Sequence, residues 1–252
     1  MRQLEGQISL ITGAAGGIGS AIARAFVSEG AMVALLDRPG QPLELLAAEF
    51  GASVIAVPAD ITNSDQVSSA VNTAVQHFGG LTSLVNAVGI LRQGRIDEML
   101  ETDWDDLMAV NVKGVFLACK YAVPHLKASG GGTIVNLSSV SAYVGSNGSF
   151  AYTASKGAVS SLTFGIAQEL GAFGIRVNAI CPGWVDAGFT HHAMSLAPDP
   201  SVLEEQARNA HVLGRMATPD EVAKAAVFLS SSASSFVTGT SLFVDGGFMI
   251  KR

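Results

Sequence analysis

The chain has few of the residues that mark a secreted, metal-binding or nucleic-acid-binding protein. Its 252 residues include two cysteines, Cys119 and Cys181, which lie far apart without the spacing of metal ligands. We therefore expect buried thiols in a reducing compartment rather than a disulfide. The net charge is −6 and no run of lysine and arginine offsets it. This balance argues against a nucleic-acid partner.

Long apolar runs and charged side chains are scarce as well. No apolar run approaches the ~20 residues of a membrane-spanning helix, and the first residues show no hydrophobic signal core. These absences predict a cytoplasmic protein that contacts no membrane. Charged residues make up 14% of the chain and hydrophobic residues 48%. We expect a sizeable core and a surface partly covered by other copies of the chain.

Short apolar runs alternate with longer helix-like stretches along most of the chain. The runs are apolar at consecutive positions, which is typical of strands buried on both faces. This alternation predicts an α/β fold, a doubly wound parallel sheet in one domain over residues 1–252. We expect strands at 8–12, 32–37, 53–58, 83–86, 133–138, 176–180 and 241–244, and helices at 17–29, 42–50, 64–78, 102–127, 150–172 and 219–230.

Residues 185–216 interrupt this alternation, because they contain no strong strand signal. A long insertion at the end of a strand is often a lid. We predict a substrate-binding lid, in which Trp184, Phe189 and Met194 line an apolar pocket or pack the lid itself.

Two adjacent histidines, His191 and His192, lie in the same segment. Adjacent histidines cannot easily share one metal ion, and no cluster of carboxylates or cysteines lies nearby in sequence. We predict no metal site and expect both side chains to make a pocket polar or to be solvated.

A glycine-rich turn, Gly13-Ala-Ala-Gly-Gly-Ile-Gly19, separates the first expected strand from a helix. Such glycines let a diphosphate approach the amides at a helix N-terminus. The spacing departs from Gly-x-Gly-x-x-Gly, and a purely structural tight turn explains it about as well. The candidate cofactor contacts in this turn are Gly13, Gly17, Ile18 and Gly19.

Acidic residues after the next two strands strengthen the dinucleotide interpretation. Asp37 ends the second expected strand, where a carboxylate can accept hydrogen bonds from both ribose hydroxyls and so favour NAD over NADP. Arg38 follows it and could instead pair with the 2′-phosphate of NADP. Asp60 and its neighbour Ile61 are candidates for the adenine side, although Asp60 could equally support a helix N-terminus.

Tyr152 and Lys156 are four residues apart in an expected helix and therefore share one face. An ammonium within about 4–6 Å of a phenol favours the phenolate and lowers its pKa by about one to three units. That shift would suit general acid/base catalysis. The alternative is an exposed helix face that carries the pair by chance.

Taken in order along the chain, these motifs resemble those of the short-chain dehydrogenase/reductase family, in its single-domain branch. The resemblance covers nearly the whole chain and implies a Rossmann-like fold of about seven strands. It rests on the glycine turn, Asp60, Asn86-Ala-Val-Gly89, Asn111, Ser139, Tyr152-x-x-x-Lys156, Pro182-Gly183 and Val244-Asp-Gly-Gly247.

The resemblance implies a role for each catalytic residue. Tyr152 would be the general acid/base, and Lys156 would hold the nicotinamide ribose and lower the pKa of the tyrosine. Ser139 would bind the substrate oxygen, although chemistry alone does not distinguish it from Ser138. Asn111 would anchor a water that relays the proton through Lys156.

The resemblance also implies cofactor contacts at Asn86, Gly89, Pro182, Gly183 and Val185, beside Tyr152 and Lys156. The family's Asn-Asn-Ala-Gly is here Asn-Ala-Val-Gly, so the second asparagine, which normally supports the sheet centre, is lost.

A second departure follows Pro182-Gly183, where the family often has Val-x-Thr. Ala187 takes the threonine position here. The contact to the nicotinamide carboxamide is therefore lost or passes to Thr190.

These observations predict an NAD-dependent oxidoreductase for a secondary alcohol or ketone, such as a cyclic alcohol or a polyol. Helix 150–172 carries only Lys156 and Glu169 as charges, and its counterpart in the family packs in a subunit interface, so we expect a homotetramer. The alternatives are an NADP-dependent ketone reductase, indicated by Arg38, and a dinucleotide-binding regulator without turnover. Retention of all four catalytic residues disfavours the regulator.

Overall fold

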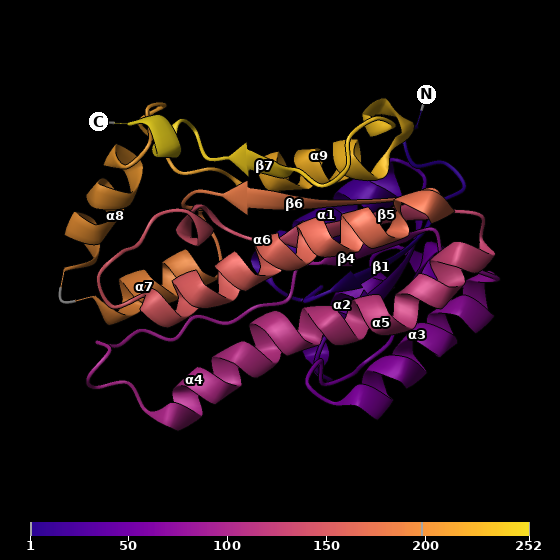
Figure 1. Cartoon of the computed structure of the whole chain (residues 1–252), viewed down its shortest axis with the longest axis horizontal. Coiled ribbons are helices and arrows are strands. Elements are labelled where there is room, and N and C mark those ends of the chain that lie inside the picture. Colours follow the sequence, from indigo (N-terminus) through magenta and orange to yellow (C-terminus); the bar gives the residue numbers. More distant parts are fainter. Residues whose placement is uncertain (1, 198, 252) are drawn as a thin grey trace.

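The computed structural model describes residues 2–197 and 199–251, whose arrangement is shown in Figure 1. Within them, seven strands form one parallel sheet in the order β3-β2-β1-β4-β5-β6-β7. The doubly wound parallel sheet predicted from the sequence is confirmed. The strands are β1 (Ile8–Thr12), β2 (Met32–Leu36), β3 (Val54–Ala56), β4 (Ser83–Asn86), β5 (Gly132–Leu137), β6 (Ile175–Pro182) and β7 (Ser241–Val244).

Neighbouring residues of each central strand face opposite sides of the sheet, since side chains alternate along a strand. Leu10 and Ile11 of β1 are both fully buried, in the apolar cores on the two sides of the sheet. Ile134 and Val135 of β5 repeat this division. Both faces require apolar side chains, which explains why the strands read as unbroken apolar runs.

Helices cover both faces of the sheet. One group packs on the Ile11 side, and a second group packs on the Leu10 side, in front of the sheet in Figure 1. The first group is α1 (Gly17–Ser28), α2 (Gln41–Ala48) and α9 (Pro219–Ser230); the second is α3 (Ser64–Phe78), α5 (Gly114–Ala128) and α6 (Phe150–Leu170). The helix expected at 102–127 is α4 (Glu101–Met108) joined to α5 by a π-helical turn, Ala109–Lys113.

The continuous helix Glu101–Ala128 is long and apolar enough, by length and composition alone, to span a membrane. It is not an unbroken apolar run, because acidic residues fill its first turns and lysines interrupt the rest. Of its most apolar 18 residues, 44% are buried inside the protein. Core helices share these properties, so the helix by itself assigns no membrane contact.

Residues 185–216, the segment without a strong strand signal, contain regular structure that was not among the helices expected from the sequence. Two helices form there, α7 (Phe189–Leu196) and α8 (Pro200–Asn209). Asp199 caps α8 by accepting backbone N–H bonds. A parallel bridge between Val185 and Ala217 brings the two ends of the segment together at the carboxyl end of β6.

Candidate active site

The predicted site residues meet at the carboxyl edge of the sheet. Strand β1 pairs with β2 on one side and with β4 on the other, so the connections after β1 and β4 leave on opposite sides. Such a switch point opens a crevice in which dinucleotides bind. Gly13, Asp37 and Ser139 follow β1, β2 and β5 at this edge, with Ser138 between β5 and Ser139, and Asn86 ends β4.

The glycine turn fits the approach of a diphosphate. Helix α1 begins at Gly17, and its N-cap, Gly16, makes no side-chain capping bond. The amides of the first turn are therefore not occupied by a cap, and they suit an anion. A Cβ at Gly13 would lie 2.5 Å from Val88 Cα, and one at Gly19 would overlap the Gly13 carbonyl oxygen. The turn thus also needs these two glycines for its own packing.

Asp37 lies directly after β2 and faces the glycine turn. Its carboxylate accepts the N–H of Ala15 at 2.9 Å and the N–H of Arg38 at 2.8 Å. These bonds hold the acid beside the turn, where a ribose-binding acid is expected. The side chain of Arg38 is exposed.

Asp60 and Ile61 make contacts that serve the fold. Thr62 donates to Asp60 Oδ1 from its backbone at 2.9 Å and from its hydroxyl at 2.8 Å. These bonds hold the pKa of the Asp60 carboxyl below its usual value. Ile61 is buried and packs against Gly114 of α5. The contacts favour the structural alternative for Asp60, and adenine contacts by either residue stay a prediction.

The amide of Asn86 is buried at the centre of the sheet. Its Nδ2 donates to Asn136 Oδ1 at 2.8 Å, and Asn136 donates to the Thr163 hydroxyl at 3.0 Å. The chain thus links β4, β5 and α6. Asn86 itself therefore supports the sheet centre in this chain, where the family's second asparagine is missing. Its backbone, rather than its side chain, is left for a cofactor.

The two serines after β5 have different surroundings. The Ser138 hydroxyl is buried, donates to the Lys156 carbonyl oxygen at 3.0 Å and lies 2.8 Å from the Ser160 hydroxyl. The Ser139 hydroxyl accepts the N–H of Ser141 at 3.1 Å and lies close enough to the phenol of Tyr152 to influence its pKa. The geometry therefore favours Ser139 as the residue that faces a substrate oxygen.

Tyr152 and Lys156 share one face of α6, as their spacing predicts, and Lys156 Nζ lies 5.6 Å from the phenol ring centre. The ammonium, however, donates to the Leu137 carbonyl oxygen at 2.7 Å. Burial raises the pKa of Tyr152 to about 12, opposed by the smaller effect of the Ser139 hydroxyl. The expected lowering by Lys156 is absent because the ammonium is turned toward β5. The phenol therefore keeps its proton at neutral pH.

Burial has the opposite consequence for the amine, because it disfavours the charged form of lysine. It lowers the pKa of Lys156 to about 8, and a smaller electrostatic effect of the nearby Cys181 raises that pKa. Lys156 is thus largely protonated at pH 7 and loses its proton within a short range above that pH. Two groups that can give up a proton lie on one helix face.

Asn111 lies in the π-helical turn and is fully buried. Its Oδ1 accepts the N–H of Ile90 at 2.8 Å, and its Nδ2 donates to the Ile90 carbonyl oxygen and the Ser155 hydroxyl, both at 3.0 Å. The amide ties the loop after β4 to α6. The amide is thus occupied by protein partners, and a relay water held by Asn111 beside Lys156 stays a prediction.

Gly89 lies where the loop after β4, the π-helical turn and α7 meet. A Cβ there would lie 3.4 Å from Asn111 Oδ1, 3.5 Å from Lys156 Nζ and 3.7 Å from Phe189 Cζ. The Phe189 ring also stands edge-on to the Tyr152 ring, with centroids 6.3 Å apart. Helix α7 thus reaches the catalytic residues through Phe189.

Pro182, Gly183 and Val185 lie at or just after the carboxyl end of β6. Gly183 donates its N–H to the Val244 carbonyl oxygen at 3.2 Å, and Val185 is buried. Ala187 approaches the glycine turn, since a Cβ at Gly17 would lie 2.7 Å from the Ala187 Cβ. A methyl group therefore stands there in place of the hydroxyl that threonine would supply.

Thr190 is buried in the first turn of α7, and its N–H donates to the Ala187 carbonyl oxygen at 3.0 Å. His191 and His192 are exposed, and His191 Nε2 lies 2.8 Å from Asp186 Oδ1. Within residues 2–197 and 199–251, no three histidine, cysteine or acidic side chains gather in a way that could hold a metal ion.

Two residues near the site were missed by the sequence analysis. Ser155 accepts a hydrogen bond from Asn111, and its place three residues after Tyr152 on a helix could have revealed it. His211 accepts the N–H of Trp184 from a loop, where no spacing signals its position.

The chain matches a protein-family model described as "Enoyl-(Acyl carrier protein) reductase" over residues 13–249. It is 37% identical over 252 residues to D-threitol dehydrogenase of Mycolicibacterium smegmatis, covering 99% of this chain and 95% of that protein. It is 40% identical over 250 residues to 2-(S)-hydroxypropyl-CoM dehydrogenase 3 of Xanthobacter autotrophicus, covering 97% of each. The solved structure of ligand-free Thermoplasma acidophilum aldohexose dehydrogenase matches with a TM-score of 0.91 at 36% identity, covering 100% of this chain and 97% of that one.

These similarities span the glycine turn, the catalytic helix α6 and the segment with α7 and α8. The two relatives and the solved structure are all dehydrogenases by name. The chain belongs to the short-chain dehydrogenase/reductase family of oxidoreductases, which act on small molecules with a nicotinamide cofactor, NAD(H) or NADP(H).

Proposed function

We propose that this protein is an NAD-dependent dehydrogenase that moves a hydride between the nicotinamide ring and the carbinol carbon of a secondary alcohol. The observation that carries the proposal is the meeting of Ser139, Tyr152 and Lys156 beside the turn that Asp37 braces. Polyols and cyclic alcohols are the substrate classes we favour, since one relative is named for the polyol threitol.

Residues of the crevice would hold the cofactor, which supplies the hydride acceptor or donor when bound. The uncapped N-terminus of α1 suits its diphosphate. The Asp37 carboxylate would accept hydrogen bonds from the ribose hydroxyls and repel a 2′-phosphate. Arg38, exposed beside it, supports the NADP-dependent reductase as the second candidate.

Tyr152 would exchange the proton on the substrate oxygen. A pKa of about 12 keeps the phenol protonated, which suits donation to a ketone oxygen. Alcohol oxidation requires the phenol to lose that proton first. Lys156 lies on the same helix face, and its pKa of about 8 would let it take part in relaying the proton to solvent. The Ser139 hydroxyl would stabilise the charge that develops on the substrate oxygen.

Three further properties complete the proposal. Residues 185–216 form the substrate-binding lid of the single domain, since Phe189 of α7 lies against Tyr152. The protein is a homotetramer, because α6 carries little charge and exposes Phe164. It works in the cytoplasm on a small molecule, with neither nucleic acid nor membrane as partner.

The test measures initial rates with NAD⁺ and with NADP⁺ over cyclic alcohols, aliphatic secondary alcohols and polyols. We expect NADH formation with at least one class. Asp37→Ala should lower the affinity for NAD⁺ more than the affinity for NADP⁺. Asp65 is an exposed acid on α3, and Asp65→Ala should change neither affinity. Unchanged preference in Asp37→Ala would mean that the carboxylate does not read the ribose. Dinucleotide binding without any turnover would favour the regulator.

A further inference from the structure

The neck of the lid, where residues 182–187 leave the sheet and Ala217 returns to it, is closed by backbone hydrogen bonds. Ala217 donates its N–H to the Trp184 carbonyl oxygen at 2.9 Å and accepts the N–H of Asp186 at 2.8 Å. The remaining polar group of the Trp184 backbone, its N–H, donates to Nε2 of His211 at 3.1 Å. A side chain from the far end of the lid thus completes the neck.

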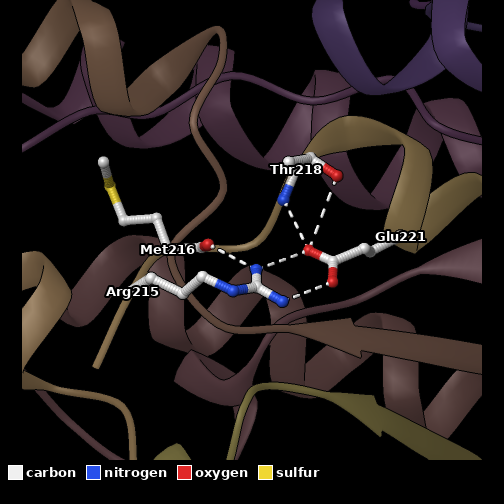
Figure 2. Close-up of polar contacts among 4 residues, drawn as sticks. All are labelled: Arg215, Met216, Thr218 and Glu221. Carbon is white, nitrogen blue, oxygen red and sulfur yellow. Dashed lines mark hydrogen bonds and ion pairs between the residues drawn. The ribbon is translucent and has the colours of Figure 1, made fainter. Parts of the chain in front are cut away.

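The residues on either side of Ala217 are held to Glu221 of α9, and Figure 2 shows the contacts among Arg215, Met216, Thr218 and Glu221. Arg215 donates to both carboxylate oxygens of Glu221, at 2.8 and 2.7 Å, and to the Met216 carbonyl oxygen at 3.0 Å. Glu221 also accepts the N–H of Thr218 at 2.9 Å. His211 is the matching anchor on the Trp184 side.

The two ring nitrogens of His211 have opposite hydrogen-bonding roles. Nδ1 lies 2.8 Å from the carbonyl oxygen of Ala207 in α8, which can only accept, so Nδ1 carries the hydrogen. Nε2 is then the lone-pair nitrogen that accepts from Trp184. The neutral ring joins α8 to the segment at the end of β6. It is 1% exposed, so neither partner is readily replaced by bulk water.

The residues around His211 leave a space that its ring fills. A Cβ at Gly183 would lie 2.5 Å from His211 Nε2, so a larger residue there would displace the imidazole. The Phe248 ring packs against the other side, with centroids 5.7 Å apart. An apolar side chain at position 211 could fill the space, but it would leave the Trp184 N–H without an acceptor.

We propose that His211 is a positioning residue that fixes the backbone of residues 182–184 to the end of α8, so that the lid and the nicotinamide end of the crevice keep one relative position. His211 touches no reacting atom and acts through Gly183 and Trp184. Its effect on catalysis rests on the proposed function, whereas its effect on the neck does not.

Two variants separate the two bonds of the ring. His211→Gln can place its amide oxygen near the Nε2 position and keep the acceptor for Trp184. His211→Asn can place its amide N–H near the Nδ1 position and keep the bond to Ala207, but it leaves the Trp184 N–H unpaired. Both are made with Trp104→Phe, which leaves Trp184 as the single tryptophan of the chain.

We expect His211→Asn to raise the Kd and KM for the dinucleotide by about tenfold, the scale of one unpaired buried donor. Its kcat should change less, and the emission of Trp184 should shift to the red. His211→Gln should match the Trp104→Phe protein in its affinity for the dinucleotide, in its kcat and in the emission of Trp184. Thermal unfolding is measured in parallel, because each variant loses one buried hydrogen bond.

A purely structural role predicts that the two variants lose stability and activity to the same degree, and that result would overturn the proposal. The emission of Trp184 is recorded without any dinucleotide. It therefore tests the neck even if the parent protein proves to have no dehydrogenase activity, and an unshifted emission in His211→Asn would also overturn the proposal.

Discussion

Ser138 and Ser139 carry the same hydroxyl group, and only their neighbours distinguish them. Ser138 turns into the interior and satisfies the Lys156 carbonyl oxygen and the Ser160 hydroxyl. Ser139 turns toward Tyr152 in the crevice. Successive side chains of an extended chain point to opposite sides. Ser138 therefore supports the fold, while Ser139 faces the candidate site.

Alanine substitutions at the two serines should separate these positions. Ser138→Ala should lower the free energy of unfolding by about 1 kcal/mol and leave kcat/KM near the parent value, because it removes a buried hydrogen bond. Ser139→Ala should lower kcat/KM by about 10²–10³-fold, the usual cost of losing one donor to a developing oxyanion. Urea unfolding and steady-state kinetics measure both. The opposite pattern would place the substrate oxygen at Ser138.

At this scale, the positions of the candidate residues could be predicted from the sequence, but several of their partners could not. Tyr152 and Lys156 share a face because helical spacing requires it. The direction of Lys156 Nζ depends on the Leu137 carbonyl oxygen of β5, and that of the Asn86 amide on Asn136. Such contacts join segments far apart in sequence, and no local pattern encodes them.

Among the elements, the predicted strands and most helices were confirmed within a few residues, whereas α7 and α8 were missed. Helix α7 has eight residues and no side-chain cap, so its local sequence signals little. Its contact with Tyr152 through Phe189 is tertiary. Helix α8 does carry a signal, because Asp199 at the N-cap precedes Pro200 at the first helical position.

The ion pair between Arg215 and Glu221 at the start of α9 should make the free energy of unfolding depend on pH in the acidic range. The Arg215 side chain, with further hydrogen bonds from Thr218, lowers the pKa of Glu221 from 4.5 to about 2. Because the folded state binds this proton less tightly, the stabilisation is fully present above about pH 4.5 and is lost as pH falls toward 2.

Glu221→Gln should therefore lower the urea midpoint at neutral pH and flatten its decline between pH 4.5 and 2. The pair is partly exposed, so the effect should be modest. Glu204→Gln removes the exposed partner of Arg208 in α8 and serves as the control. Equal acid sensitivity in the parent and in Glu221→Gln would contradict this account.

At the scale of the whole molecule, the sheet was predictable because burial on both faces imposes unbroken apolar runs. Its assembly was predicted from the low charge, and the structure adds exposed aromatic side chains. Phe116 of α5 and Phe164 of α6 are 49% and 45% exposed on neighbouring helices. Part of the apolar helix Glu101–Ala128 also faces outward. We interpret these helices as an interface between copies of the chain.

Phe116→Glu and Phe164→Glu should each split the proposed tetramer into smaller species without unfolding the chain, because a charge in an apolar interface is costly. Light scattering after size exclusion gives the mass, and circular dichroism checks the fold. Leu45→Glu changes a still more exposed apolar residue on α2; it is the control and should leave the mass unchanged. A parent protein that is a monomer would contradict the interface.

The most direct test of the proposed function compares the parent with Tyr152→Phe in two measurements on the same samples, NADH binding by calorimetry and the rate of NADH formation from an alcohol substrate of the parent. Removal of the hydroxyl takes away the proton that Tyr152 would exchange and little of its packing against Phe189. We predict an NADH affinity near that of the parent and no measurable turnover. Substantial turnover by Tyr152→Phe would contradict the assignment of this phenol as the general acid/base.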